Sequence, residues 1–415
     1  MKTVVMGGGV VGVTTAYYLA KRGHEVVVLD AQEELATQAT AGNAGLIAPG
    51  HSFAWASPAA PSMLFRSLLG RETAIRVKLR PDARLAAWGM KFLRECTAER
   101  AQRNTLNKLR LCQYSQKSMN ELAAEEDLQY HQVNKGVFYL YRDAAGLELG
   151  AKKMKLLWDH GQKQDVLDSN EVARLEPALE PVKSQFAGAI YGVTDASGDS
   201  ALFTRNLAKV CEGMGTSFRL RTFIRGLISE DDRVTGVVTD QGIVRGDNYV
   251  LSLGIDSPKV AKSVGVRLPI YPAKGYSVTL PIREGNTPPV IGGVDEETLV
   301  AWCRIGDYFR LTSTAEFAGY RRTWKPSDFS NIFRMAQDLF PNAADYSEGT
   351  YRACMRPMTP DGPAIIGKGP HRNLYYNTGH GHMGWTMACG SSRAITDVIE
   401  GVTPEVDLTG HEFRY

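Results

Sequence analysis

Apolar and polar positions at the start of the chain predict a strand, a helix and a second strand. Residues 2–6 (KTVVM) are apolar and β-branched, which indicates a buried strand. Residues 10–23 (VVGVTTAYYLAKRG) indicate a helix, with basic residues in its last turn and Gly23 where a left-handed backbone is favoured. Residues 24–30 (HEVVVLD) indicate a second buried strand that ends in Asp30. The three segments make one strand–helix–strand unit.

Similar patterns recur in the second half of the chain. Three further strands are predicted for TSFRL, VTGVVTD and NYVLSLG, at residues 216–220, 234–240 and 248–254. Later, residues 373–379 (NLYYNTG) indicate a strand, residues 379–384 a glycine-bearing turn and residues 385–401 a helix. A second strand, turn and helix is thus predicted far from the first in sequence.

The turn between the first strand and its helix carries the glycine pattern GxGxxG. Gly7 permits a tight turn, Gly9 lets the backbone approach a pyrophosphate, and Gly12 lets helix and strand pack closely. The N–H groups at the helix N-terminus then point at the phosphates. Asp30, 18 residues after Gly12, would accept hydrogen bonds from ribose hydroxyls and disfavour a 2′-phosphate. The motif predicts a non-phosphorylated, adenosine-containing dinucleotide, bound by Gly7, Gly9, Val10, Val11, Gly12 and Asp30.

Two features favour FAD over NAD as that dinucleotide. After Asp30 the chain continues as a loop of small residues (AQEELATQATAGNAGLIAPG) and a long basic helical region, instead of further strand–helix units. The second strand, turn and helix supply another helix N-terminus, which suits a partial negative charge. In a flavoprotein such a charge develops at the N1 and C2 carbonyl locus of the reduced ring. We therefore predict that the N-terminal glycines hold the adenylate end of FAD and the turn at 379–384 holds the flavin end.

Four sequence blocks resemble the FAD-dependent D-amino-acid dehydrogenases, within the wider family of D-amino-acid oxidases and glycine and sarcosine oxidases. The blocks are GxGxxG with Asp30, ATAGNAGLIAPG, GDSALFTRNLAKVCEGMG, and MRPMTPDGPAIIG together with NTGHGHMGWTMACGS. The resemblance implies oxidative deamination of a D-amino acid to a 2-oxo acid and ammonia. Hydride would pass from the substrate Cα to flavin N5, and electrons would pass on to a quinone or another carrier. Further cofactor contacts are expected at Ala41, Gly42, Asn43, Ala44, Gly45, Leu46, Gly254, Gly379, His380, Gly381, Met383, Gly384, Trp385 and Thr386.

Arg356, in CMRPMTPDG, is the leading candidate for a substrate contact. Oxidation at Cα requires the substrate carboxylate to be held, and a planar guanidinium does this bidentately. Arg356 is similar in position to the arginine that oxidase members of the family use. The alternative is an arginine paired with a nearby carboxylate as structural support. Tyr276, or else Tyr271, is predicted to add a phenolic hydrogen bond to the same carboxylate, the alternative being a core or rim tyrosine.

Arg310 and His51 complete the catalytic candidates. Arg310 lies on an apparent strand (YFRLTSTAEF), similar to where sarcosine oxidases place an oxygen-activating lysine. An arginine there argues against fast reaction with oxygen and is predicted to make a second carboxylate contact. His51, after GLIAP, is the candidate base, the alternative being a loop histidine at the pocket mouth. No dedicated base is required if the substrate amine binds neutral, because its lone pair can expel the hydride.

The histidines and cysteines suggest two further interpretations. His380 and His382 form an HxH pair, but no third ligand is identifiable, so no metal site is predicted and His380 is expected to line the flavin. Cys354, in CMRPMTPD, resembles the cysteine through which sarcosine oxidases tether the flavin. We expect non-covalent FAD, with a covalent link through Cys354 as the alternative, since a buried inert thiol is the commoner fate of a single cysteine.

Composition narrows the remaining choices. The 415 residues are 43% hydrophobic and 22% charged, as in a folded globular protein. A net charge of +3 without nucleic-acid-binding signatures argues against a nucleic-acid partner. We see no secretory signal, no apolar stretch of about 18 residues that would span a bilayer, and no disulfide or zinc spacing among six cysteines. These observations predict a cytoplasmic protein.

Residues 64–96 carry a local net charge of +5, which exceeds that of the whole chain. Basic side chains there surround apolar ones such as Trp88 and Phe92. This segment is either a solvated helical face or a surface in peripheral contact with anionic membrane lipid, where a quinone would collect electrons. The sequence does not predict an oligomeric state.

The predicted architecture is a mixed α/β fold of two interleaved domains, with the pocket where they meet. A Rossmann-type FAD-binding domain takes residues 1–60, 160–270 and 345–415. A substrate domain, built on a mostly antiparallel sheet with helices, takes residues 61–159 and 271–344.

The predicted function is that of an FAD-dependent D-amino-acid dehydrogenase in amino-acid catabolism. Three alternatives fit the same motifs. One is an FAD-dependent oxidase or dehydrogenase of secondary amines or imino acids, such as sarcosine, proline or hydroxyproline. The others are a nicotinamide-dependent oxidoreductase and a flavin-binding subunit without its own substrate site. The preferred amino-acid side chain is not predicted.

Overall fold

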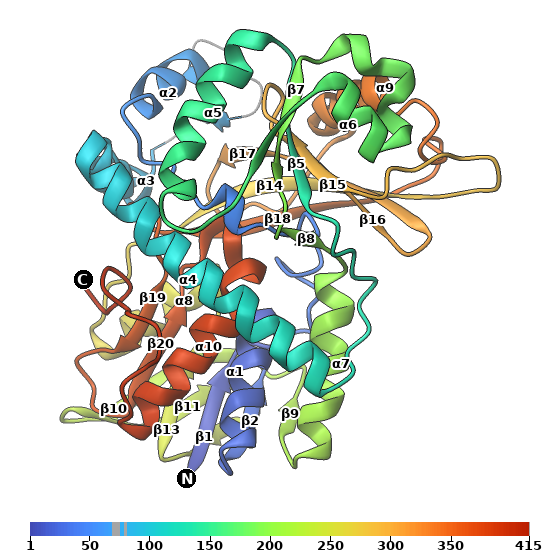
Figure 1. The fold of residues 1–415 in the computed structure, drawn as a ribbon. Helices are drawn as coiled ribbons and strands as arrows, with labels where there is room; N and C mark the ends of the chain where they lie inside the picture. The colour runs from blue at the N-terminus through green and yellow to red at the C-terminus, as the bar shows by residue number, and fades with distance from the viewer. Residues whose placement is uncertain (69–74, 79–80, 415) are drawn as a thin grey trace.

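The glycine-bearing strand–helix unit lies at the centre of a six-stranded sheet in the computed structural model, which describes residues 1–68, 75–78 and 81–414 (Figure 1). β1 (Lys2–Met6) pairs in parallel with β2 (Glu25–Leu29) on one side and β13 (Asn248–Leu251) on the other. The strand order is β19–β20–β13–β1–β2–β9, and β19 runs antiparallel to its neighbour. The outer strands are β19 (Ile365–Lys368), β20 (Leu374–Thr378) and β9 (Ser217–Arg219). The predicted strand–helix–strand unit is confirmed, and the late strand β20 joins the same sheet.

Four helices pack together beside this sheet. They are α1 (Val10–Lys21), α4 (Ala98–Glu125), α7 (Ser200–Gly213) and α10 (Gly384–Glu400). Buried apolar side chains from all four share one cluster, represented by Val13, Leu122, Phe203 and Ala388. The long helix α4 begins after Thr97, whose side chain accepts a hydrogen bond from the Arg100 N–H. α4 runs obliquely across α10 in Figure 1.

A second sheet of nine strands occupies the upper half of Figure 1. Its order is β18–β14–β17–β16–β15–β5–β7–β6, with β4 paired to β17. Most neighbours are antiparallel, whereas the β15–β5 and β17–β4 pairs are parallel. The strands are β4 (Ile75–Val77), β5 (Val137–Tyr141), β6 (Asp165–Asp168), β7 (Gly188–Gly192), β14 (Tyr271–Pro281), β15 (Gly292–Asp295), β16 (Val300–Ile305), β17 (Tyr308–Phe317) and β18 (Thr350–Met358).

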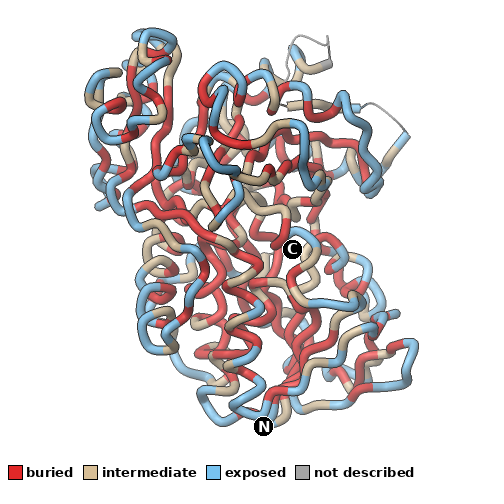
Figure 2. Tube along the Cα trace, turned by 90° about the vertical axis from the view of Figure 1, so that its right-hand side faces the viewer, coloured by how far each residue is buried: buried red, intermediate tan, exposed pale blue. Residues whose placement is uncertain are grey.

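Both faces of the second sheet are covered by helices. Successive residues of β5 point to opposite faces, so Phe138 packs in the cluster with α6 (Ser169–Leu175) and α9 (Ser330–Leu339). Its neighbour Tyr139 packs instead with Met154 of α5 (Ala144–Trp158). Figure 2 shows buried residues running through the middle of the molecule, with exposed residues at the outer turns.

The smaller elements connect these layers. A three-stranded antiparallel sheet is formed by β10 (Ile224–Glu230), β11 (Arg233–Thr239) and β12 (Gly242–Val244). Short strands β3 (Leu46–Ile47) and β8 (Ala196–Ser197) pair with each other. The remaining helices are α2 (Ala60–Leu68), α3 (Ala83–Glu95) and α8 (Ser257–Ala261).

The mixed α/β fold is confirmed, while the division into two domains stays a prediction. Strand pairing differs from the predicted boundaries in three places. β6, β7 and β18 fall in ranges assigned to the FAD-binding domain, yet they pair within the second sheet. α4, assigned to the substrate domain, packs on α1 and α10. These partners lie far apart in sequence, so no local periodicity indicates them.

Candidate active site

A cavity of about 1120 Å³ lies where strands of the first sheet end and the β14–β17–β18 part of the second sheet begins. Its lining includes Gly7, Asp30 and Gly254, which follow β1, β2 and β13. The carboxyl ends of parallel strands are the usual ligand site of an open α/β sheet. The volume exceeds the roughly 300–1,000 Å³ of an ordinary small-molecule pocket. A dinucleotide together with a small substrate requires such space.

One end of the cavity is formed by the N-terminus of α1. The N-cap is Gly9, which offers no side-chain hydrogen bond, and the first turn carries no acidic residue. The Val10 N–H donates to Thr40 Oγ1 at 3.1 Å, and Gly7, Gly9, Val10 and Val11 line the cavity. A Cβ on Gly12 would lie 1.8 Å from the Gly7 carbonyl oxygen, so only glycine permits this close packing. The remaining N–H groups of this turn suit phosphate oxygens.

Asp30 lies beside this turn and lines the cavity. Its Oδ2 accepts the Gly8 N–H at 2.6 Å, and its Oδ1 accepts the Gln32 N–H at 2.8 Å. The carboxylate is therefore fixed by two backbone donors at the end of β2. The end of β2 is where a carboxylate is expected that accepts hydrogen bonds from the ribose hydroxyls.

The other end of the cavity is formed by the turn before α10. The N-cap Met383 makes no side-chain capping hydrogen bond, and the first turn of α10 has no acidic residue. The cavity lining here comprises His380, Gly381, His382, Met383, Gly384, Trp385 and Thr386. Gly379 lies just outside it, with a φ of +77° that favours glycine. Two uncapped helix N-termini thus meet one cavity, which is the arrangement that FAD needs for its phosphates and its reduced ring.

The loop at 41–46 forms one wall of the cavity between the two helix N-termini. Arg310 holds this loop by hydrogen bonds from outside the cavity. Arg310 Nη1 donates to the carbonyl oxygens of Ala41 and Asn43, both at 2.9 Å, and its Nε donates to Thr279 Oγ1 at 2.6 Å. Burial lowers the pKa of Arg310. Its side chain is absent from the described cavity lining, so the predicted contact with a substrate carboxylate is not supported. Within the loop, Gly42, Asn43, Ala44 and Leu46 reach the cavity, whereas Ala41 and Gly45 do not.

Cys354 packs against the loop at 41–46. A Cβ on Gly42 would lie 2.0 Å from the Cys354 Sγ, so the glycine leaves room for the sulfur. The thiol donates to the Gln38 carbonyl oxygen at 3.5 Å and lines the cavity. Burial raises the pKa of Cys354, although the charges of Arg352, Arg310 and Arg356 oppose this. The sulfur is near the cofactor cavity as a protonated thiol.

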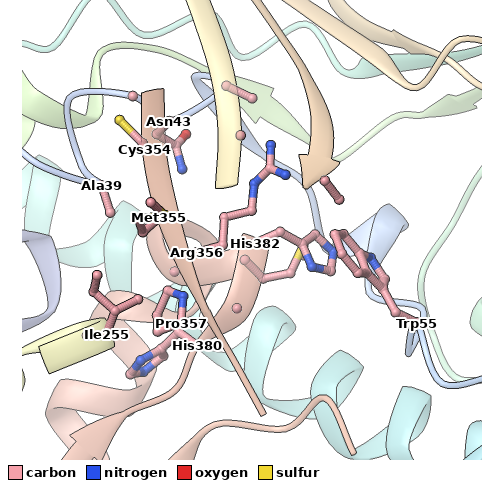
Figure 3. A pocket seen from close by; sticks show the side chains of 18 of the residues that line it. Ala39, Asn43, Trp55, Ile255, Cys354, Met355, Arg356, Pro357, His380 and His382 are labelled. Atoms are coloured by element: carbon pink, nitrogen blue, oxygen red, sulfur yellow. The ribbon is translucent and has the colours of Figure 1, made fainter. Parts of the chain in front are cut away.

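Arg356 projects from β18 into the cavity (Figure 3). Its Nη1 donates to the Thr314 carbonyl oxygen at 2.6 Å. No carboxylate among the described residues pairs with it, so the alternative of a structural ion pair is not supported. Burial lowers the pKa of Arg356 to about 10, which leaves the guanidinium charged at neutral pH. A half-buried cation that faces a cavity and has no carboxylate partner among the described residues is suited to an anionic ligand.

Tyr276 lies on the opposite face of its strand. It is 1% exposed, and its hydroxyl donates to Glu316 Oε2 at 3.0 Å in the core of the second sheet. Because successive side chains of a strand alternate, Gly275 faces the cavity and Tyr276 faces away. The predicted contact of Tyr276 with substrate is therefore wrong. Tyr271 donates to Asp82 Oδ2 at 2.7 Å and is likewise outside the described lining.

His51 lines the cavity but is already paired. Its Nε2 lies 3.1 Å from Glu296 Oε1, and its ring stacks on Tyr139 with centroids 5.3 Å apart. Burial raises the pKa of Glu296, but the charge and hydrogen bond of His51 and the charge of Lys153 outweigh burial and lower it. An ionised Glu296 thus holds His51 at the cavity wall. Sequence reasoning missed Glu296, Tyr139 and Lys153, because they come from separate elements of the second sheet and α5.

The two histidines of the HxH pair have different surroundings. His380 Nε2 lies 3.1 Å from Ser391 Oγ, and burial lowers the pKa of His380 to about 3. His382 stacks on Trp55 with centroids 4.8 Å apart, near Arg356 in Figure 3, and burial keeps its pKa well below the usual value. Both are neutral. The described residues contain no cluster of three side chains that could hold a metal ion.

Comparisons with known proteins show the family of the chain. A family model described as DAO, FAD dependent oxidoreductase, matches residues 2–398. A protein of Mesorhizobium japonicum named D-amino acid dehydrogenase 2 is 43% identical over 411 residues, covering 99% of both chains. A D-amino acid dehydrogenase of Paramagnetospirillum magneticum is 41% identical over 413 residues, covering 99% of this chain and 97% of the relative.

Solved structures share the fold at lower identity. Glycine oxidase from Bacillus cereus has a TM-score of 0.74 at 21% identity, covering 96% of this chain and 95% of that chain. L-proline dehydrogenase from P. horikoshii has a TM-score of 0.75 at 17% identity, covering 99% and 96%. The family match over almost the whole chain establishes FAD as the cofactor and excludes the nicotinamide alternative. The chain belongs to the DAO family of FAD-dependent oxidoreductases.

Proposed function

We propose that this protein is a D-amino-acid dehydrogenase that converts a D-amino acid to a 2-oxo acid and ammonia. The observation that carries the proposal is Arg356, a half-buried guanidinium without a carboxylate partner among the described residues, directed into the cofactor cavity. The names of relatives at 37–43% identity support the D-amino-acid substrate. Electrons would then pass to a quinone or another carrier.

The chain's own residues would orient the substrate. FAD, when bound, supplies the acceptor for the hydride that leaves Cα. Arg356 would hold the substrate carboxylate through two N–H groups and so fix the direction of the Cα–H bond. Neutral His380 and His382 add no positive charge that would repel the substrate amine. The amine loses a proton, and hydrolysis of the resulting imine gives the 2-oxo acid and ammonia.

Anaerobic titration of the purified protein tests this reaction directly. D-amino acids are expected to bleach the flavin absorbance near 450 nm (roughly the oxidised flavin maximum), whereas L-amino acids, sarcosine and hydroxyproline leave it unchanged. Bleaching only by sarcosine or a cyclic imino acid would instead establish the secondary-amine alternative. No bleaching by any of these donors would favour the flavin-binding subunit.

FAD is proposed to be bound without a covalent link. A tether requires a thiolate, and the raised pKa of Cys354 keeps this thiol protonated. Acid precipitation is expected to leave a colourless pellet and a yellow supernatant, measured by absorbance. The Cys354→Ala variant serves as the control and should release its flavin equally. A yellow pellet from the wild type but not from Cys354→Ala would contradict the proposal.

A peripheral membrane contact is proposed for the surface of α2 and α3. Phe65, Met90 and Leu93 are 63%, 60% and 51% exposed there. Exposed basic side chains surround them: Arg66, Arg84, Lys91 and Arg94. Phe65 and Leu93 also line the outer part of the cavity, so an apolar acceptor in the lipid would reach the flavin from this side. Arg71 and Arg80, which contribute to the charge of residues 64–96, lie outside the described residues.

Sedimentation with vesicles tests this surface. Among the described residues, no helix is long and apolar enough to cross a bilayer. The protein is expected to pellet with anionic vesicles at low salt and to be released at high salt. The Phe65→Asp/Leu93→Asp variant should stay in the supernatant. Trp158→Asp, at a 50% exposed apolar residue of α5, should pellet like the wild type. Wild-type protein that stays in the supernatant at low salt would refute the contact.

A further inference from the structure

Thr314 has an unusual backbone in the middle of β17. Its φ is +66°, in the left-handed region that a β-branched residue rarely adopts. The cause is a bulge in the pairing of β14 with β17. Lys274 pairs with Glu316 and Tyr276 pairs with Ser313, so Thr314 and Ala315 together stand opposite Gly275.

The bulge in β17 and Gly275 of β14 together form the space that the Arg356 side chain occupies. A Cβ on Gly275 would lie 2.5 Å from Arg356 Nη2, so the missing side chain is what admits the guanidinium. The turned backbone of Thr314 directs its carbonyl oxygen at Arg356 Nη1, at 2.6 Å. Three strands thus fix the guanidinium: β18 carries it, β14 leaves space and β17 accepts one hydrogen bond.

The hydroxyl of Thr314 has no partner in the described structure. The residue is 4% exposed, it lines the cavity, and its Oγ1 is buried without a hydrogen bond. The neighbouring Ser313 hydroxyl, by contrast, accepts from Asn331 Nδ2 at 3.5 Å. A buried hydroxyl without a partner is unfavourable, and a ligand oxygen bound beside Thr314 in the cavity would satisfy it.

We propose that the Thr314 hydroxyl donates a hydrogen bond to the substrate carboxylate that Arg356 holds. Its own carbonyl oxygen is bonded to the guanidinium, so an anion on the free edge of Arg356 lies next to the same residue. A neutral donor beside a cation adds a directed hydrogen bond without a second charge. The inference rests on the proposed function, because it needs a carboxylate substrate at Arg356.

Two substitutions separate the hydroxyl from the shape of the side chain. Thr314→Val removes the hydroxyl and keeps the β-branched form, whereas Thr314→Ser keeps the hydroxyl. The probe is 2-aminoisobutyrate, an amino acid that has no Cα hydrogen and so binds without being oxidised. Binding to the FAD-loaded protein is followed by the change in flavin absorbance. tert-Butylamine, which lacks the carboxylate and likewise has no hydrogen on the carbon that bears the amine, is the matched ligand.

In Thr314→Val, the Kd for 2-aminoisobutyrate is expected to rise about tenfold or more, as for the loss of a hydrogen bond to a charged group. In Thr314→Ser it should stay within about twofold of the wild type, and tert-butylamine should bind all three proteins alike. Wild-type affinity in a Thr314→Val protein with full FAD content would overturn the inference. If Thr314→Val does not fold, Thr314→Ala gives the same comparison.

The two proposals fail in different ways. If D-amino acids reduce the wild-type flavin but Thr314→Val binds the probe normally, only the role of Thr314 is wrong. If no D-amino acid reduces the wild-type flavin and 2-aminoisobutyrate does not bind, both the proposed function and this inference are wrong.

Discussion

Replacement of Arg356 by alanine is expected to lower kcat/KM for a D-amino acid by about 10²- to 10³-fold. Truncating one partner of a buried charge pair costs about 2–5 kcal/mol, part of which is the unpaired charge left behind. Arg310, the other arginine predicted to contact the carboxylate, already donates hydrogen bonds to the loop at 41–46 and is not expected to replace Arg356. Arg356→Lys keeps the charge but loses the planar fork, so an intermediate loss of about tenfold is expected.

The measurement is the rate of anaerobic flavin reduction against substrate concentration. Arg352→Ala is the matched control, because Arg352 lies on the same strand, is exposed and is absent from the cavity lining. It should react like the wild type. All variants are expected to bind the same amount of FAD as the wild type, because Arg356 is proposed to contact the substrate and not the cofactor. The flavin content of each variant is measured to check this. Unchanged turnover in Arg356→Ala would assign the substrate site to other residues.

Replacement of Gly12 by alanine is expected to abolish FAD binding or folding. The added Cβ would lie 1.8 Å from the Gly7 carbonyl oxygen and 2.9 Å from its carbon, and both are backbone atoms that cannot rotate away. Relief would require α1 to move off β1, which also moves the N–H groups that line the adenylate end. Overpacking of this kind costs at least about 1–3 kcal/mol before the loss of bound cofactor is counted.

The ratio of flavin to protein absorbance and the thermal unfolding temperature measure this effect. Gly213→Ala is the control, since nothing lies within 4 Å of a Cβ built there in α7. It should keep its flavin and gain about 0.5–1 kcal/mol in stability. A Gly12→Ala protein with full flavin content and normal stability would show that the helix tolerates a shift away from the strand.

Local patterns were sufficient to predict the strand–helix–strand unit at the start of the chain. GxGxxG, the apolar strands on either side and Asp30 are close in sequence, and the pairing of β1 with β2 follows from them. The resemblance added Arg356, and the structure directs that side chain into the cavity. Residues 380–384 of the glycine-bearing turn before α10 also line the cavity.

The substrate half depends on strand register, which local patterns do not contain. Tyr276 and Gly275 differ by one position, and the bulge in β17 and the pleat of β14 decide which of them faces the cavity. Arg310 has the residue type expected of a substrate contact, but its side chain binds the loop at 41–46 from outside the cavity. Thr314 gave no signal in the sequence, since its role comes from a backbone angle and an unpaired hydroxyl.

The position of α10 beside α1 has a consequence for the order of assembly. The wall predicted to hold the adenylate end of FAD comes from residues near 7–12, and the wall predicted to hold the flavin end comes from residues near 380–386. A nascent chain therefore carries a finished phosphate turn long before the opposite wall has been synthesised. Cofactor capture must follow late, once β20 and α10 have joined β13 and α1. Bound FAD then stabilises the packing of the N-terminal segment against the C-terminal segment. Loss of FAD is expected to destabilise both segments together.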